Sequence, residues 1–515
     1  CTNAVYKDAR QVASSAHALI FEDLTNPSGG FTADEYQQIA DSFDRLIWPV
    51  VTGNFGEPSD RDGNGKVIIL YTRAVNEMTP ANSGSVFGGF YYGRDLYPKT
   101  AGGGLDGCPG SNVAEMFYVL AADPNGEVNQ NKRPKDQVRR STQGTVAHEL
   151  QHLINASRRL FVLNSNSREE TWMNEGLSHI AEELVFHAAA GTAPRQNLGA
   201  GEIRASAQRT DAFNSYAISN FGRFRTFIEA PSAESPIDAD DDLETRGSAW
   251  HFLRYSADRR AGNDRDVWYA LVNSTSAGLA NYQAAFGVEP LEWLRDWTVS
   301  IYADDAVAGV ESRFTMPSWN FRSLYPLLTT PARYPLKVDT LLNGVSRSVA
   351  VQAGSAAYLR FAVPTGGTGD VRLSAMNTTA AGACTTVTLG VGQVYQGSPA
   401  TVSALCVGEG EYTLIPFFRS QTGGATTQMS VVATGISTPA GPPSPSLAPS
   451  TPLFNRSGTG LNPELLQDAV GIEARLRARE RQELGRLTPG GLRANSSAAA
   501  DPVAPEVRVS LLRTR

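Results

Sequence analysis

The stretch TVAHELQHLI, residues 145–154, constrains this chain most, because it places two histidines four positions apart in a segment with helical periodicity. Positions i and i+4 of an α-helix share one face, so His148 and His152 would project side by side and could bind one metal ion. Glu149 would point near the open position of that ion, where a carboxylate can take a proton from water. The stretch therefore predicts a metal-binding helix that carries its own base.

The segment has the features of a helix before any chemistry is assumed. Ser141 and Thr142 offer N-terminal caps. An apolar stripe would fix the helix against a core, and its members are Val146, Leu150, Leu153 and Ile154. Two polar residues at this spacing can also mark a solvated face, so the histidine pair alone leaves that second interpretation open.

A catalytic zinc needs three protein ligands and one position left for water, so a third ligand must come from elsewhere. The segment REETWMNEGLSHIAEELVF, residues 168–186, again has helical spacing, and Glu175 lies in its first turns. The residues between the two segments leave room for a loop that joins two packed helices. We therefore expect His148, His152 and Glu175 to bind zinc.

Together, HELQH and WMNEG resemble the zinc-binding segments of the gluzincins, the zincin metallopeptidases whose third ligand is a glutamate. The order of DRDGNGKVIILYT, GGFYYGRDL, SNVAEMFYVLA, GTVAHELQHLINAS and TWMNEGLSHIAEE resembles that in bacterial secreted peptidases of the hyicolysin type. This resemblance covers residues 40–300 and implies an α+β zincin-like metallopeptidase domain that acts on proteins or peptides. It also implies His148, His152 and Glu175 as zinc ligands and Glu149 as general base.

The resemblance implies a further group that stabilises the developing oxyanion, usually a tyrosine or a histidine on a later helix. Four residues could serve, and the sequence does not choose between them: His251, Tyr255 and Arg246 in the segment 245–259, and Tyr216 before it. The alternative is an ordinary core helix built on Trp250, Phe252 and Leu253.

The second helix carries other polar residues with less specific signals. His179 follows Glu175 by one helical turn and could hydrogen-bond a ligand, and a partly exposed helix histidine is the alternative. Glu182 and Glu183 are predicted to lie on a solvated face, and the alternative is that one of them supports a metal ligand. By analogy with zincins, the strand VAEMFYV, residues 113–119, is expected to be the sheet edge that aligns the substrate backbone.

Composition divides the chain into two predicted folded units. Residues 1–330 contain all six histidines, with strand-like runs at 65–72, 88–97 and 113–122 before the helical segments. This order predicts a sheet followed by a helical part. Residues 335–435 shift to short alternating runs of valine, threonine, serine, alanine and glycine, which predict a small antiparallel β-sandwich.

The remaining residues predict no further compact unit. Residues 436–457 are rich in proline and serine and are expected to form an extended linker. The tail, residues 458–515, contains one amphipathic helix at 462–487, and its apolar positions are Leu465, Val470, Ile472, Leu476 and Leu484. Because an isolated arginine-rich helix is marginally stable, we expect the tail to be poorly ordered. An anchor and an interaction helix are the alternatives that composition leaves open.

The cysteines predict an exported protein. The first residue, Cys1, in place of methionine indicates that an export signal has been removed. Cys1 is either a lipid anchor at a membrane face or half of a disulfide with Cys108. Cys384 and Cys406 flank residues of strand and turn composition and could form a second disulfide in an oxidising compartment. We expect a secreted or cell-surface location.

Charge and hydropathy argue against two classes of partner. The net charge is −7, and no long basic stripe alternates with aromatic residues, so nucleic acid is not an expected partner. No apolar run reaches the length of about 18 residues that a transmembrane helix needs.

A second metal site is one interpretation of DRDGNG, residues 60–65. Asp60, Asp62 and Asn64 alternate, and Gly65 is sixth, as in the first half of a calcium loop. Tyr71 stands where the loop would have its final glutamate, and the stretch runs directly into a strand-like run. Calcium binding and a tight turn before a strand therefore remain alternatives.

The sequence as a whole predicts an exported zinc-dependent endopeptidase with Glu149 as general base. The alternative is a surface binding or adhesion protein, in which the zincin domain is inactive and the β-sandwich binds a ligand. Because no predicted ligand or base is missing, the sequence favours the peptidase.

Overall fold

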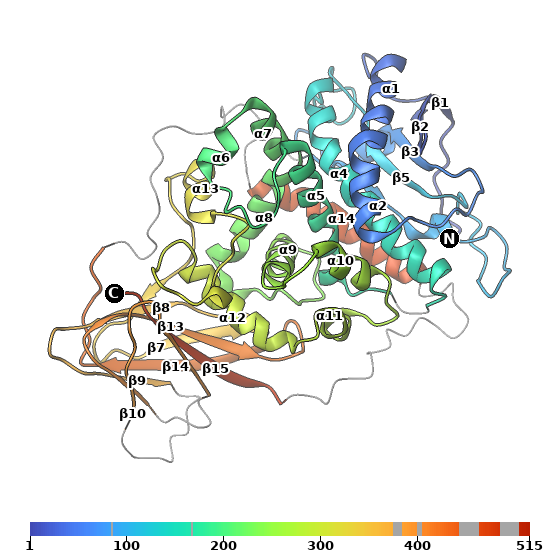
Figure 1. The fold of residues 1–515 in the computed structure, drawn as a ribbon. Helices are drawn as coiled ribbons and strands as arrows, with labels where there is room; N and C mark the ends of the chain where they lie inside the picture. Colours follow the sequence, from blue (N-terminus) through green and yellow to red (C-terminus); the bar gives the residue numbers. More distant parts are fainter. Residues whose placement is uncertain (84–85, 166–167, 374–383, 399–403, 442–462, 485–503) are drawn as a thin grey trace.

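The computed structural model shows a mixed arrangement of sheets and helices (Figure 1). It describes residues 1–83, 86–165, 168–373, 384–398, 404–441, 463–484 and 504–515. The predicted linker, residues 436–457, lies mostly outside these described residues. Within the described ranges, no helix combines the length and the apolar character that crossing a lipid bilayer requires.

The first sheet has the strand order β1-β2-β3-β5-β4. Its strands are β1 (Ala9–Ser14), β2 (Ala18–Asp23), β3 (Val67–Thr72), β4 (Gly89–Tyr91) and β5 (Met116–Leu120). Strands β2, β3 and β5 are parallel, whereas β1 and β4 pair antiparallel at the two edges. The register aligns Ile20, Ile69 and Phe117 across the parallel strands, and all three side chains are fully buried.

The edge position corrects one expectation. Residues 113–119 overlap β5, which lies between β3 and β4 and is therefore not an edge strand. The adjacent edge is β4, the short strand that begins at the second of two consecutive glycines. Period-two patterns identify strands but not their order in a sheet, so the sequence could not distinguish β5 from β4.

Two long helices carry the predicted site residues. Helix α4 (Lys135–Ser157) packs against β4 and β5 on one side and against α5 (Thr171–Ala190) on the other. Helix α4 begins before Ser141 and Thr142, so the predicted caps are wrong. Both hydroxyls instead donate back to the carbonyl oxygen of Val138, a bond that serine and threonine form inside helices.

The other helices surround this pair. They are α1 (Ala33–Ser42), α2 (Trp48–Phe55), α3 (Arg73–Glu77), α6 (Ala200–Arg204), α7 (Ala207–Ala212), α8 (Ile218–Glu229), α9 (Leu243–Asp258), α10 (Asp264–Val272), α11 (Gly278–Phe286), α12 (Pro290–Ala303), α13 (Phe321–Leu328) and α14 (Pro463–Leu484). Short π and 3-10 segments are η1 (Phe43–Ile47), η2 (Gly93–Leu96), η3 (Arg158–Val162), η4 (Phe213–Ala217), η5 (Pro231–Ala233) and η6 (Ser312–Phe314). Helix α9 packs between α5 and α8.

Two five-stranded sheets follow, with the orders β10-β12-β9-β14-β7 and β11-β15-β13-β8-β6. Their strands are β6 (Asp339–Thr340), β7 (Arg347–Gln352), β8 (Leu359–Val363), β9 (Gly369–Leu373), β10 (Thr385–Val387), β11 (Val394–Gly397), β12 (Leu405–Val407), β13 (Gly410–Arg419), β14 (Thr426–Thr434) and β15 (Glu506–Arg513). Apolar side chains of both sheets share one buried cluster.

The sequence predicted purely antiparallel pairing in this region, and the structure shows mixed pairing. Strand β6 is parallel to β8, and β10 is parallel to β12. In each case the strand that lies between the two in sequence belongs to the opposite sheet, so the chain returns in its original direction. The alternation of apolar residues predicts strands but does not show which strands belong to which sheet.

Strand β15 corrects the prediction that the tail is poorly ordered beyond its helix. It pairs antiparallel with β13 and β11, and Leu511 lies opposite Leu414 and Tyr395. Val507, Val509 and Leu511 alternate along it and join the buried cluster of the two sheets. The burial of these side chains holds β15 in the sheet. The composition of residues 458–515 did not indicate that this segment would be a strand.

The two sheets also pack against the helical part. Tyr358, Ile415, Phe417 and Leu512 belong to the same buried cluster as the first sheet and its helices. Helix α12 contacts both β13 and β15 at this junction. The C-terminal strands therefore share a core with the helices that precede them.

Both expected disulfides are present. Cys1 is bonded to Cys108 with a sulfur separation of 2.08 Å, and Cys384 is bonded to Cys406. A sulfur in a disulfide cannot also carry a lipid, so the pairing of Cys1 favours the disulfide over the lipid anchor. Two disulfides also fit an oxidising compartment.

Candidate metal centre

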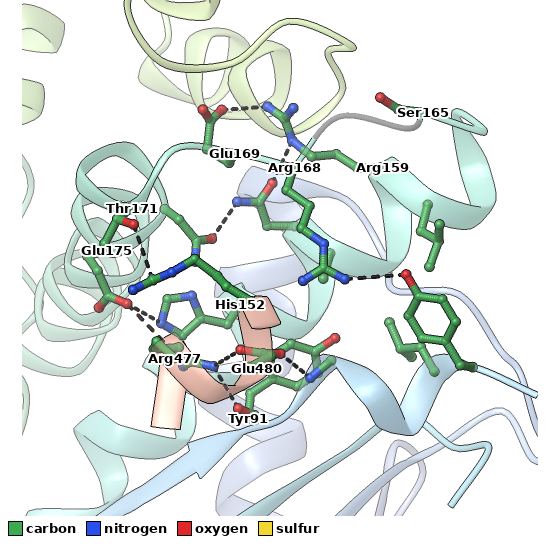
Figure 2. A pocket seen from close by; sticks show the side chains of 18 residues that line it. Tyr91, His152, Arg159, Ser165, Arg168, Glu169, Thr171, Glu175, Arg477 and Glu480 are labelled. Carbon is green, nitrogen blue, oxygen red and sulfur yellow. Dashed lines mark hydrogen bonds and ion pairs between the residues drawn. The ribbon is translucent and has the colours of Figure 1, made fainter. Parts of the chain in front are cut away.

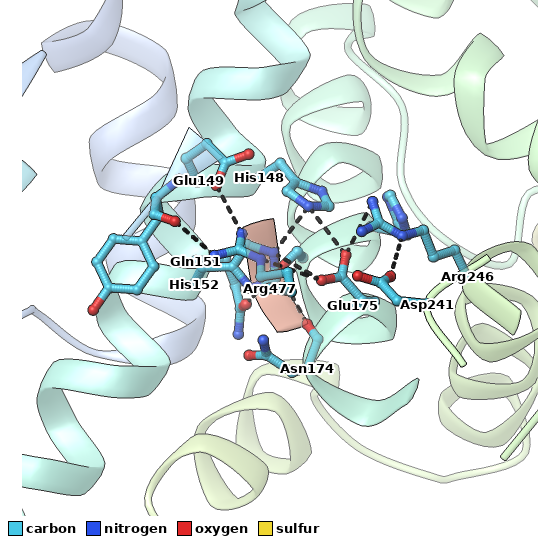
Figure 3. A network of polar contacts seen from close by, with 12 residues as sticks. His148, Glu149, Gln151, His152, Asn174, Glu175, Asp241, Arg246 and Arg477 are labelled. Atoms are coloured by element: carbon cyan, nitrogen blue, oxygen red, sulfur yellow. Dashed lines mark hydrogen bonds and ion pairs between the residues drawn. The ribbon is translucent and has the colours of Figure 1, made fainter. Parts of the chain in front are cut away.

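The structure brings His148, His152 and Glu175 together. The two Nε2 atoms lie 3.0 Å apart on α4. From α5, Glu175 places Oε2 3.4 Å from Nε2 of His148 and Oε1 3.4 Å from Nε2 of His152. All three side chains are buried. The three predicted ligands thus converge on one point between the two helices (Figure 3).

This arrangement suits a zinc ion. Zinc binds imidazole nitrogen and carboxylate oxygen at about 2.0–2.2 Å, so neighbouring ligand atoms of a tetrahedral site lie about 3.3–3.6 Å apart. The two separations of 3.4 Å fall within this range, and the separation of 3.0 Å is slightly below it. Two imidazoles and one carboxylate are also a donor set that leaves a fourth position for water.

Hydrogen bonds fix the orientation of both imidazoles. Nδ1 of His148 lies 2.8 Å from Oε1 of Glu182, and Nδ1 of His152 lies 3.0 Å from Oγ of Ser178. The Ser178 hydroxyl donates in turn to Gln151. A proton on each Nδ1 leaves the lone pair on Nε2, which is the atom that faces the other ligands.

Glu182 and Glu183 do not lie on a solvated face, so that prediction is wrong. Both are buried, because α5 is covered by α4, α9 and the η4 segment. Glu182 bridges His148 and His179, at 2.8 and 3.0 Å from their Nδ1 atoms. Burial would raise the pKa of Glu182, but His179 and His148 hold it below its usual range.

His179 is fully buried and lies close enough to take part in the site. One ligand atom each from His148, Glu175 and His179 lies within 4.8 Å of the others, which defines a second possible set of metal ligands. Burial, together with Arg223, lowers the pKa of His179 to about 3, so its ring is neutral. For His148, burial favours the neutral ring, but the carboxylates of Glu175 and Glu182 raise its pKa to about 10.

Glu149 lies at the junction of α4 and the edge strand β4. Its Oε2 accepts a hydrogen bond from the backbone N–H of Tyr91 at 2.7 Å. The side chain is buried and adjacent in sequence to His148. The carboxylate predicted as a base is therefore held next to the edge of the sheet.

Of the four residues considered for oxyanion stabilisation, Arg246 is the one with a contact to a site residue among the described interactions. Its Nη1 lies 3.3 Å from Oε2 of Glu175, and its Nε lies 2.6 Å from Asp241. The other three have partners elsewhere. Tyr216 donates to Gln143, Tyr255 donates to the carbonyl of Arg313, and His251 stacks on Phe224 and accepts from Trp297.

Arg477 and Glu480 of the C-terminal helix α14 reach the site, and neither was predicted from the sequence. Arg477 places Nη2 3.2 Å from Oε2 of Glu149 and Nε 3.9 Å from Oε1 of Glu175. Its Nη1 donates to the carbonyl oxygen of Tyr91 at 2.6 Å. The sequence predicted an amphipathic helix here but expected the tail to be poorly ordered, so it gave no reason to place Arg477 at the site.

A cavity of about 110 Å³ adjoins the site. Its lining includes His152, Glu175, Arg477 and Glu480, which lie close together in Figure 2. Arg168 and Tyr97 also line it, and Arg168 donates to the tyrosine hydroxyl at 3.3 Å. Side chains of α14 therefore form one wall of the space beside the predicted metal ligands.

The predicted calcium loop forms an acidic cluster with a different third member. Asp60, Asp62 and Glu115 each place one oxygen within 4.8 Å of the others. Glu115 accepts from the Ser59 hydroxyl at 2.5 Å and from the Arg61 N–H at 2.7 Å. The loop bonds to itself as a turn that leads into β3, so both alternatives of the sequence analysis remain, and calcium binding stays a prediction.

Comparison with known proteins gives one partial similarity. The chain is 32% identical over 155 residues to the neutral metalloprotease ShpI of Staphylococcus hyicus, a match that covers 30% of this chain and 32% of the relative. The chain thus spans about a third of the length of the curated relative that it matches. No protein-family profile matches the chain.

Proposed function

We propose that the chain is an exported zinc-dependent endopeptidase, with His148, His152 and Glu175 as zinc ligands and Glu149 as general base. The observation that carries the proposal is the convergence of the two Nε2 atoms and the Glu175 carboxylate at separations of 3.0–3.4 Å. The similarity to a metalloprotease supports the same class. The two disulfides support an extracellular location.

The fold also supports the finer class, a gluzincin of the hyicolysin type. In this proposal residues 1–330 form the zincin domain and residues 335–435, with β15, form a β-sandwich. The helix that bears two ligands packs against an antiparallel edge strand, β4, which can align an extended peptide by strand addition. The third ligand comes from the next long helix, as the glutamate-ligand arrangement requires.

In the proposed mechanism, a bound zinc would polarise the peptide carbonyl and acidify a water molecule. Glu149 takes the proton of the attacking water and passes it to the leaving amine. The Tyr91 N–H holds the Glu149 carboxylate beside the edge strand. Glu182 and Ser178 hold the two imidazoles in the orientation that keeps Nε2 free for the metal.

The test compares the unchanged chain with Glu149→Gln. Both proteins should bind about one zinc ion, and hydrolysis of a fluorescently labelled unfolded protein should fall at least about 100-fold in the variant. The exposed Glu311, a salt-bridge partner of Arg313, gives the matched control Glu311→Gln, which should behave like the unchanged chain. Equal hydrolysis by the chain and Glu149→Gln would reject the proposed base.

The alternative, a surface binding or adhesion protein with an inactive zincin domain, makes a different prediction. Neither protein would then hydrolyse any member of a broad peptide library, although the chain would bind cell-wall material. The same two proteins therefore separate the two functions.

A further inference from the structure

Helix α14 docks on the proposed active site through one face. Ile472, Leu476, Glu480 and Leu484 follow at four-residue spacing, so they share that face. Ile472 packs into the main core, and Leu484 is buried beside Tyr97 and Cys108. The helix contacts α8, α9 and η2, so it is held by the elements that surround the metal ligands.

Arg477 projects from this face towards the residues that would do the chemistry. Its guanidinium binds the carboxylate of Glu149 and approaches that of Glu175, and its side chain is only 7% exposed. The same guanidinium donates to the carbonyl oxygen of Tyr91 on the edge strand (Figure 2). One side chain thus engages the proposed base, a proposed ligand and the strand that would align a substrate.

Two acidic residues anchor the same helix. Glu480 accepts a hydrogen bond from the backbone N–H of Gly93 and lies 3.2 Å from Nη1 of Arg477. Glu483 lies 3.6 Å from Nη1 of Arg94 and 3.9 Å from the amino group of Cys1. These contacts fix the position of α14 along the edge of the site, so Arg477 is not a freely moving surface side chain.

The positive charge of Arg477 lies close to the position that a bound metal ion would occupy. A dication bound by Glu175 and a guanidinium 3.9 Å from the same carboxylate repel each other. Arg477 donates to Oε2 of Glu149, the oxygen that also accepts from the Tyr91 N–H, so this oxygen is occupied while α14 is docked. The docked helix should therefore weaken metal binding and slow general-base catalysis.

We propose that α14 is an inhibitory element of this chain and that Arg477 blocks the site by competing with the metal ion and by occupying Glu149. The catalytic part of this inference rests on the proposed peptidase function, whereas the competition with metal does not. Because coupling between two binding events is reciprocal, zinc should loosen α14 by the same factor by which α14 weakens zinc.

The test uses the full chain, Arg477→Ala and a matched control, Arg475→Ala. Arg475 is exposed on the same helix, so both substitutions remove one arginine and raise helix propensity equally. Zinc affinity is measured by competition with a chromophoric chelator, and hydrolysis is measured with the labelled unfolded protein. Arg477→Ala should raise both by at least about tenfold, the effect of 1.4 kcal/mol, and Arg475→Ala should change neither.

A second variant releases the helix at its other end. Leu484→Asp places a carboxylate against Tyr97 and Cys108 and should undock α14 without altering any proposed ligand. It should raise zinc affinity in the same direction as Arg477→Ala. Hydrogen exchange of residues 472–484 should also be faster in zinc-loaded protein than in metal-free protein.

The outcomes separate this inference from the proposed function. If Arg477→Ala and Leu484→Asp match the unchanged chain in both zinc affinity and hydrolysis, α14 is not inhibitory. If they bind zinc more tightly but no variant hydrolyses a peptide, competition with the metal is supported and the peptidase proposal fails. Adding Glu149→Gln to Arg477→Ala should abolish the hydrolysis that the single variant gains.

Discussion

Arg477 and Glu149 form an ion pair of 3.2 Å although 328 positions separate them in the chain. Both side chains are almost completely buried, at 7% and 2% exposure. Removing one member of a buried ion pair leaves the other charge without its partner, at a cost of about 3–5 kcal/mol. The position of α14 and the state of the proposed base are therefore physically linked.

Replacement of Glu182 should weaken metal binding without touching a ligand. In Glu182→Gln, His148 loses the carboxylate that fixes its Nδ1 proton, at 2.8 Å in the structure. We expect zinc affinity to fall about 10–100-fold, as for other partners of metal-bound histidines. Chelator competition measures the change, and the exposed Glu77 provides the control Glu77→Gln. Unchanged affinity in Glu182→Gln would show that this bond does not orient the ring.

Glu183 should make stability depend on pH. Burial raises its pKa to about 7 from 4.5, although Arg254 and Trp319 oppose the rise. The folded state holds this proton more tightly than the unfolded state, so its stabilising effect is complete below pH 4.5 and is lost as the pH rises through about 7. The amide side chain in Glu183→Gln does not titrate, so the variant lacks this dependence on pH.

We therefore expect Glu183→Gln to gain stability over the unchanged chain as the pH rises, by up to ~3 kcal/mol above pH 7. Urea unfolding at pH 5 and pH 8 measures the free energy of unfolding of both proteins. The gain should appear at pH 8 and be small at pH 5. A difference that is the same at both pH values would show that Glu183 does not titrate in this window.

The disulfide of Cys1 with Cys108 should contribute more stability than the second disulfide. It closes a loop with a sequence separation of 107, against 22 for Cys384 and Cys406. Loop-closure entropy grows with loop length, so its removal by paired cysteine-to-serine substitutions should cost about 2–5 kcal/mol. Denaturant unfolding of each paired variant compares the two. A larger loss from the shorter loop would reverse the expected order.

Truncation after residue 330 should not leave a stable protein. Tyr358, Ile415, Phe417 and Leu512 fill part of the main core, so their removal exposes apolar surface on α12. We expect the truncated chain to aggregate, measured as soluble yield and by size-exclusion chromatography. Co-expression of residues 331–515 should restore solubility. A soluble, monomeric and active fragment 1–330 would contradict the shared core.

The sequence predicted those parts of the site that depend on local spacing. Histidines at i and i+4 must share a helix face, and the glutamate at the start of a second amphipathic helix required only that the two helices pack. Strands β3, β4 and β5 and helix α14 lie within the predicted runs. Each of these features is encoded within a few neighbouring residues.

Features that depend on long-range packing were not predictable. Whether β4 or β5 forms the sheet edge is set by strand order, and whether Glu182 is buried is set by the helices on both sides of α5. Arg477 is one of several arginines with similar neighbours along α14, and only the docked position of the helix selects it. These contacts join segments that are far apart in the sequence, so no local pattern reveals them.

The placement of α14 between β14 and β15 has a consequence for what a cut chain would look like. Strand β14 pairs with β7 and β9, and β15 pairs with β13 and β11, so both flanks of α14 are bound into sheets that share one core. After a single backbone break at residues 442–462 or 485–503, the two resulting polypeptides would therefore remain associated. Such a nicked protein would elute as the intact species from a gel-filtration column and separate into two bands only after denaturation.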